Sequence, residues 1–275
     1  FFGKNQIELL HTKFNKMLLG VHSKASNLAC YSELGEVPLA IDIAIEIIRF
    51  WVHMINAEQD SILYDCYQYQ INELHTDKCW LMSVRDILTI AGYEEIWYQQ
   101  RVENPHAFIK GLQQKLQETY TKIAKNQLHD DSNPQKGNKL RTYRKVKIHF
   151  KREEYLHDIT DPQERKNITK LRISAHDLHI EKGRYHRPQK TPANERYCKQ
   201  CNTMDIEDEF HLIMKCNKYD IPRQELMDAI SRNTSNFINM SDESKFLHIF
   251  SCKNKYNNTN LAKYLNKVIT IRGQI

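Results

Sequence analysis

The sequence predicts a mainly α-helical fold: a helical bundle, then a small module organised by cysteine and histidine, then C-terminal helices. Apolar residues recur at helical spacing in one segment after another, which is the pattern of amphipathic helices. Glycine ends several of these segments and proline begins others, as is typical of helix termini. With 8 Gly, 7 Pro and 40% hydrophobic residues among 275, the chain can bury a core in about two domains.

Residues 1–130 are predicted to form the helical bundle, with short connections. Pro38 opens its most apolar helix, which we expect to be buried on most sides. A long amphipathic helix should begin near Pro105 and end near Leu128. The first helix is predicted over 5–19, ended by Gly20, from apolar residues at helical spacing: Ile7, Leu9, Leu10, Phe14, Met17 and Leu18.

A basic stretch follows the bundle, and we expect a linker over 131–160. From Lys136 to Arg152 it holds eight lysines or arginines and no acid, a distribution that attracts phosphate. On charge alone, a solvated linker and a phosphate-binding segment are equally good interpretations. Aromatic residues such as Tyr143 and Tyr155 lie among the charges, so the stretch can also lie against the protein or against bases.

Four potential metal ligands lie close together further along the chain. Cys198 and Cys201 form a Cys-x2-Cys pair, and His211 and Cys216 follow as His-x4-Cys. Three thiolates and one imidazole at this spacing are the ligand set of a closed, tetrahedral zinc site, which stabilises structure and leaves no position for catalysis. A short helix from Asp205 to Lys215 should carry the second pair. The alternative is that the four side chains hold no metal.

The zinc-binding module is predicted to span 161–223, and a C-terminal helical tail 224–275. Three consecutive acids at 207–209 precede the histidine, and we interpret them as acids in the first turn of its helix. Glu207 or Asp208 is also placed to orient a metal ligand or to pair with an arginine such as Arg196 or Arg223.

No catalytic residue is predicted. The sequence contains no glycine-rich nucleotide-binding motif, no G-x-S-x-G and no H-E-x-x-H. The pair Asp130-Asp131 lies in a break rich in Ser, Asn and Pro, so we assign it to a loop and not to a polymerase metal site.

The composition indicates an intracellular protein, in the nucleus or the cytoplasm, that is neither secreted nor embedded in a membrane. The chain has an odd number of cysteines, 7, and no signal-peptide core, and no stretch approaches the roughly 20 apolar residues of a membrane span. It also begins Phe-Phe without Met, so we expect a fragment of a longer protein.

The cysteine–histidine motif lies in a basic and aromatic setting, which indicates nucleic-acid binding. Arginine beside aromatic rings suits single-stranded or structured nucleic acid, so the predicted partner is RNA or DNA held through its phosphates. A helical protein-interaction module that docks a partner through the zinc knuckle is the other interpretation. The candidate nucleic-acid contacts are Arg141, Arg144, Lys145, Lys147, Arg172, Arg184, Arg187, Lys190, Arg196 and Lys199.

Several segments resemble the end of the open reading frame of animal non-LTR (LINE-like) retrotransposon reverse transcriptases. Around the motif they are L-R-I-S-A-H-D-L-H-I-E-K-G-R from Leu171, N-E-R-x-C-x-x-C from Asn194 and E-D-E-F-H-L-I-M-K-C from Glu207. Upstream, N-x-x-x-Y-S-E-L-G-E-V-P-L from Asn27 and the I-I-R-F-W segment are similar to the helical region that follows the polymerase palm in those proteins.

This resemblance implies part of an RNA-directed DNA polymerase that acts at a nicked target, with a C-terminal zinc module that helps to hold element RNA or target DNA. The paired aspartates of the palm are absent from the sequence, so we expect the chain to be inactive by itself and the polymerase portion to lie N-terminal to it. The resemblance carries over the four metal ligands and, as candidate contacts, Arg172, Arg184 and Arg196.

Overall fold

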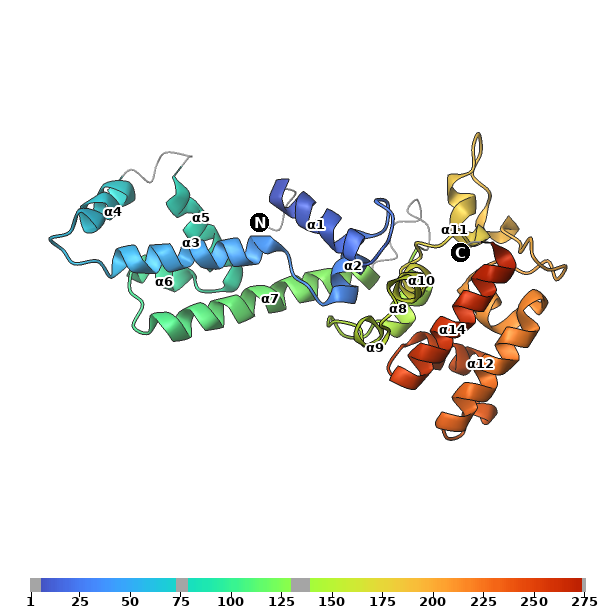
Figure 1. Ribbon diagram of the computed structural model, residues 1–275. Helices are drawn as coiled ribbons and strands as arrows, with labels where there is room; N and C mark the ends of the chain where they lie inside the picture. The colour runs from blue at the N-terminus through green and yellow to red at the C-terminus, as the bar shows by residue number, and fades with distance from the viewer. Residues whose placement is uncertain (1–5, 73–78, 130–138, 274–275) are drawn as a thin grey trace. The chain divides into compact units, whose positions relative to one another are not determined.

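The computed structural model describes residues 6–72, 79–129 and 139–273 (Figure 1). Within these ranges the chain is helical apart from loops and one isolated antiparallel bridge, between Tyr197 and Ile206. The predicted mainly α-helical fold class is therefore confirmed. No helix in the described ranges is long and apolar enough to cross a membrane. The pair Asp130-Asp131, predicted to be a loop, lies outside the described residues.

The chain divides into two compact units. One comprises Phe1–His11 with Val37–Gln127, and the other Thr12–Glu36 with Leu128–Ile275. The sequence predicted a boundary near residue 130, and the structure assigns 12–36 to the second unit. This early segment joins the unit that holds the cysteine–histidine motif.

The first unit is arranged around α3 (Leu39–Ile55), which begins directly after Pro38 and packs against its neighbours α4 and α5. The helix is buried on fewer sides than predicted, because Ile43 and Phe50 are 38% and 51% exposed. Trp51 is fully buried, with its indole N–H donating to the hydroxyl of Tyr67 at 3.1 Å. The other helices are α4 (Ile62–Asn72), α5 (Trp80–Ala91), α6 (Glu94–Gln99), most of α7 (Pro105–His129) and the start of α1 (Gln6–Leu18).

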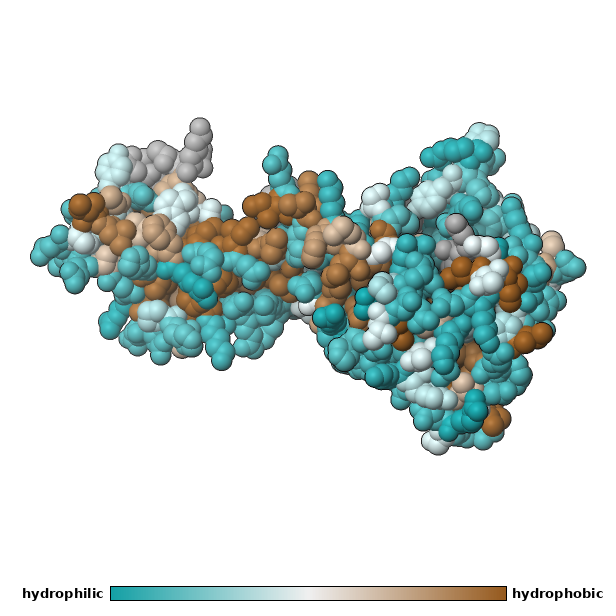
Figure 2. Space-filling view, viewed as in Figure 1, coloured by the Kyte–Doolittle hydropathy of each residue, from teal (hydrophilic) through white to brown (hydrophobic). Residues whose placement is uncertain are grey.

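Helix α1 buries polar residues and exposes most of its apolar ones. Thr12 and Lys16 point inward, where the Thr12 hydroxyl lies 3.1 Å from that of Tyr31 and the Lys16 amine donates to the carbonyl of Ser23 at 2.6 Å. These hydrogen bonds set the rotation of the helix, since each buried polar group needs a partner. The six apolar residues whose spacing predicted the helix are 48–71% exposed, and Figure 2 shows apolar side chains on the surface where α1 lies.

The second unit holds the remaining helices. Its C-terminal helix, α14, packs against α10 and α12, and Figure 1 shows α12 and α14 side by side. Its α-helices are α2 (Asn27–Leu34), α8 (Arg141–Val146), α9 (Tyr155–Asp158), α10 (Pro162–Arg172), α11 (His179–Lys182), α12 (Asp220–Asn233), α13 (Asp242–Phe250) and α14 (Lys255–Arg272). Single turns are η2 (Gly183–Tyr185), η3 (Ala193–Glu195), η4 (His211–Lys215), η5 (Asn217–Tyr219) and η6 (Phe237–Asn239).

The basic segment belongs to the core of the second unit and is not a linker. Tyr143 and Tyr155 are fully buried, and each belongs to a short helix. The backbone of Arg152 lies so close to Gly35 that a Cβ there would be 2.3 Å from the Arg152 nitrogen, and Gly35 also has a φ of +68° that favours glycine. The predicted linker is thus wrong for 139–160, while 131–138 lies outside the described residues.

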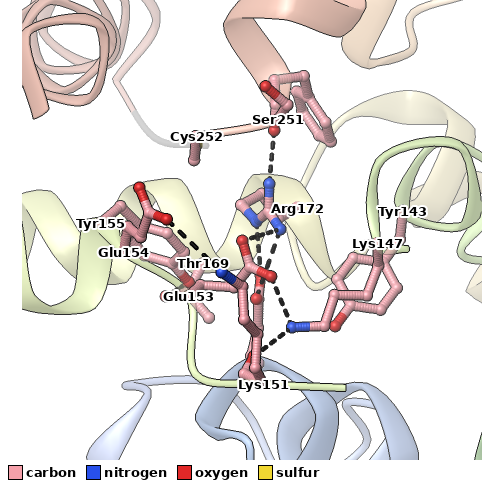
Figure 3. A network of polar contacts seen from close by, with 12 residues as sticks. Tyr143, Lys147, Lys151, Glu153, Glu154, Tyr155, Thr169, Arg172, Ser251 and Cys252 are labelled. Atoms are coloured by element: carbon pink, nitrogen blue, oxygen red, sulfur yellow. Dashed lines mark hydrogen bonds and ion pairs between the residues drawn. The ribbon is translucent and has the colours of Figure 1, made fainter. Parts of the chain in front are cut away.

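A buried ionic network joins this segment to α2 and α10 (Figure 3). The Nε atom of Arg172 donates to Glu33 at 2.6 Å, and its Nη2 atom lies 2.9 Å from the carboxylate of Glu153. Lys147 pairs with the same Glu153 at 2.5 Å. Arg172 and Glu33 are 1% and 0% exposed, so the attraction between them is poorly screened by solvent.

Candidate metal centre

The four predicted ligands converge in the second unit. Their ligand atoms all lie within 4.8 Å of one another, with 3.9 Å between the sulfurs of Cys198 and Cys216 and 3.4 Å between the sulfur of Cys201 and Nε2 of His211. A tetrahedral ion with bonds of roughly 2.3 Å to sulfur and 2.0 Å to nitrogen would place two sulfurs about 3.8 Å apart and a sulfur and a nitrogen about 3.5 Å apart. The side chains are therefore close enough to hold a metal ion, and their chemistry and spacing are consistent with zinc.

The first pair is placed by a tight hairpin. The bridge between Tyr197 and Ile206 closes it, and the amide of Cys198 donates to the carbonyl of Asp205 at 2.8 Å. The amide of Gln200 points back to the Cys198 sulfur at 3.4 Å. The two cysteines of the Cys-x2-Cys pair therefore face the same point, as the short spacing predicted.

The second pair depends on a π turn, η4, where the sequence predicted an ordinary short helix. The amide of Cys216 donates to the carbonyl of His211 at 2.8 Å, an i→i+5 hydrogen bond. In an α-helix, residues five apart differ by roughly 140° around the axis, so their side chains diverge. The wider turn places both on the same side of the backbone. Wide turns of this kind occur frequently at functional sites.

Burial shifts the pKa values of the thiols and of the imidazole in opposite directions. It raises the pKa of the Cys198 and Cys216 thiols, so in the absence of metal both hold their protons at neutral pH. Burial also acts to raise the pKa of Cys201, but hydrogen bonds from Thr203 outweigh it and the net pKa is lowered. For His211, burial lowers the pKa, which favours the neutral imidazole that metals bind.

Two aspartates lie next to His211, one at its backbone and one at its ring. Asp208 accepts a hydrogen bond from the backbone amide of His211 at 2.8 Å, which agrees with its predicted place at the start of the turn. A carboxylate oxygen of Asp205 lies 3.6 Å from Nδ1 of the same ring, on the nitrogen that does not face the cysteines. At 3.6 Å this contact is within ion-pair range and is not a hydrogen bond, and Nδ1 of His211 has no hydrogen-bond partner among the described residues.

The two glutamates of the acidic run are buried, and the first-turn interpretation missed their partners. Glu207 pairs with Arg272 of α14, and not with the suggested arginine at 196 or 223. Glu209 is fully buried, 2.9 Å from Nε2 of His176 and in an ion pair with Arg141. Burial alone would raise the pKa of Glu209, but the hydrogen bond and attraction from His176, together with the Arg141 guanidinium, lower it to about 2.

Three of the predicted nucleic-acid contacts are buried, which corrects their assignment. Arg172 and Lys147 belong to the ionic network described above, with 1% and 3% of their surfaces exposed. Arg196 is 7% exposed and donates to the backbone carbonyl oxygens of Ile180 and Thr191. Because their charged ends are held by interior acceptors, these three side chains stabilise the fold and are closed to a phosphate.

The other candidates divide by partner. Arg141 and Arg184 both pair with Glu181, at 3.2 and 2.8 Å. Arg144 donates to the backbone carbonyl of Leu128 at 2.6 Å, and Lys145 lies at the surface 2.8 Å from Glu243. The candidates whose side chains are exposed, with no ion pair recorded among the described residues, are Arg187, Lys190 and Lys199.

Fold and site together define a mainly α-helical protein with a Cys3His cluster that can hold a metal ion and in which every residue but Cys201 is buried. Comparison of the chain with protein-family models, with curated proteins and with solved structures gives no match.

Proposed function

We propose that the chain is a non-catalytic nucleic-acid-binding region in which one structural zinc ion supports a basic surface for RNA or DNA. The convergence of Cys198, Cys201, His211 and Cys216 is the observation that carries the proposal. A closed site with four protein ligands leaves no position for a substrate, so the ion would act by holding the hairpin and the π turn together.

The surface of the same segment has the composition that a nucleic acid requires. Within 182–218, six lysines or arginines are exposed, and the acids that reach the surface are Glu195 and Asp205, whose side chain is 44% exposed. Tyr185 and Tyr197 expose 50% and 37% of their surfaces among these charges. Phosphates would be neutralised by the cations, and the rings could stack on unpaired bases.

The resemblance to the end of non-LTR retrotransposon reverse transcriptases favours the same function. On this basis the chain would act inside the cell, in the nucleus or cytoplasm, beside a polymerase portion that supplies the catalytic aspartates. The bound nucleic acid would then be element RNA or target DNA, and the chain by itself would carry no enzymatic activity.

The test is a salt titration of binding to a structured RNA, a single-stranded DNA and a duplex DNA, with zinc bound. A triple variant, Arg187→Glu, Lys190→Glu and Lys199→Glu, should lose at least about tenfold in affinity, and its dependence on salt should be shallower by a slope of about 2 for single strands. The control carries the same change of charge on α7, at the exposed residues Lys110, Lys115 and Lys122. We expect it to bind nearly as wild type does.

Two results would contradict this function. A wild-type affinity that does not change with salt would favour the alternative, a helical module that docks a protein partner through the zinc knuckle. Equal losses in the two triple variants would indicate a general response to net charge, with no particular role for the surface near the metal site.

A further inference from the structure

We propose that the C-terminal helix α14 is part of the metal centre, with Arg272 positioning the Cys198 ligand through Glu207. Metal binding and the docking of α14 are then linked, and each strengthens the other. This inference rests on the proposed metal site and is independent of whether the partner is a nucleic acid.

Glu207 connects α14 to the ligand hairpin. The guanidinium of Arg272 binds both of its carboxylate oxygens, with 3.2 Å between Nη2 and Oε2. The backbone amide of His179 donates to Oε2 at 2.6 Å, and the sulfur of Cys198 lies 3.6 Å from Oε1. Glu207 is 2% exposed, so these groups and not water are its surroundings.

The charges explain why Arg272 is needed. A divalent ion held by three thiolates and a neutral imidazole would leave the cluster with a net negative charge, and Cys198 lies beside a buried carboxylate of the same sign. Like charges at this distance in a poorly solvated interior repel strongly unless a cation compensates. The guanidinium of Arg272 is that cation, and its side chain is only 10% exposed. Without it, Glu207 would oppose the thiolate that the metal requires.

A second link from α14 reaches the other half of the site. The hydroxyl of Tyr264, which is 2% exposed, donates to the carbonyl of Leu212 at 2.5 Å. Leu212 follows His211 in the π turn. The two linking residues of α14 are eight positions apart, roughly 12 Å along the helix. The helix therefore contacts the hairpin with one end and the π turn near its middle.

The consequence is thermodynamic coupling. A metal ion would join the hairpin to the π turn, and α14 joins the same two segments from outside. Whatever strengthens one connection strengthens the other by the same free energy, because coupling between two sites is reciprocal. Loss of the ion should therefore loosen the C-terminal half of α14.

The first test measures zinc affinity by competition with a chromophoric chelator. Arg272→Gln should bind zinc about 10-fold to 100-fold more weakly, the range found when groups behind metal ligands are changed. Arg272→Lys, which keeps the charge, should recover part of the loss. Lys267→Gln is the matched control on the same helix, because its amine pairs with Glu225 at the exposed surface. The cobalt-substituted spectrum should still report three sulfur ligands and one nitrogen in every variant.

The second test uses the wild-type chain and does not depend on a variant that folds. Hydrogen exchange of amides in 261–272 should accelerate when zinc is removed, while amides of α3 should not change. The inference is overturned if zinc removal leaves α14 unaffected, or if Arg272→Gln binds zinc as tightly as wild type. Neither result contradicts the proposed function, which the salt titration tests. The metal-site assignment itself would be wrong if Cys198→Ser retained stoichiometric zinc.

Discussion

Replacing Arg172 by Met should destabilise the second unit and should not act on nucleic-acid binding directly. The change removes a cation that is 1% exposed and leaves Glu33, which is 0% exposed, beside a second carboxylate on Glu153. At an effective dielectric constant of about 20, two unit charges 2.6 Å apart attract by about 6 kcal/mol. Desolvation cancels part of this, and breaking such a buried pair costs about 3–5 kcal/mol in practice.

The assay is urea unfolding followed by two signals. The three tryptophans, Trp51, Trp80 and Trp97, all lie in the first unit, so their fluorescence reports on that unit alone. Far-UV circular dichroism reports on helices of both units. We expect Arg172→Met to lower the midpoint of the dichroism change, and a loss of 3–5 kcal/mol would be a large fraction of the roughly 5–15 kcal/mol that stabilises a typical domain.

Two further variants make the reasoning refutable. Arg187→Met changes an exposed arginine in the same way and should alter the free energy of unfolding by no more than about 0.5 kcal/mol. Combining Arg172→Met with Glu33→Met removes both partners and should recover part of the stability. If Arg172→Met unfolds like wild type but binds nucleic acid more weakly, Arg172 is a nucleic-acid contact and the burial argument is wrong.

Three other predictions concern the site. Cys198→Ser should release the metal and unfold 184–223 while the helices before residue 130 persist, which hydrogen exchange and zinc analysis can measure; stoichiometric zinc in the variant would contradict the assignment. Zinc binding at neutral pH should release protons from the Cys198 and Cys216 thiols, because burial raises the pKa of both; calorimetry in buffers of different ionisation enthalpy would detect this, and binding without proton release would refute it. The Glu209 carboxyl has a folded-state pKa of about 2 against an ordinary 4.5, so it stabilises the fold above pH 4.5 and this contribution is lost as the pH falls toward 2; Glu209→Gln should flatten the acid dependence of chelator-treated protein, and an unchanged profile would show that another group is responsible.

The orientation of α1 shows where sequence periodicity is insufficient. The spacing of its apolar residues predicted the helix correctly, and Gln6–Leu18 is helical. The same spacing does not identify the buried face, because burial depends on which side of the helix finds partners. The polar side is held inward by a hydrogen bond between Thr12 and Tyr31 and by another from Lys16 to the carbonyl of Ser23. Periodicity along one helix contains no information about those partners.

The basic residues show the same limit for charge. A run of lysines and arginines indicates attraction to phosphate, but it does not show which of them already have an acid nearby. Arg172 is paired with Glu33, which lies 139 positions away in the chain. Only folding brings the two together, and the pairing turns a predicted contact into a structural residue. Lys147 was also misassigned, although its partner Glu153 lies only six positions away, just beyond the basic run.

The sequence alone determined the helical fold class and the four side chains that can hold a metal ion. Both follow from short-range patterns: apolar residues every three or four positions, and cysteine and histidine at the spacing of two tight turns. Tertiary structure decided which face of α1 is buried, which lysines and arginines are buried in ion pairs or hydrogen bonds, and which arginine contacts Glu207 beside Cys198. It also selected the π turn that brings His211 and Cys216 to the same side. These features depend on contacts between residues far apart in the chain, or on packing that favours a wide turn over a regular helix.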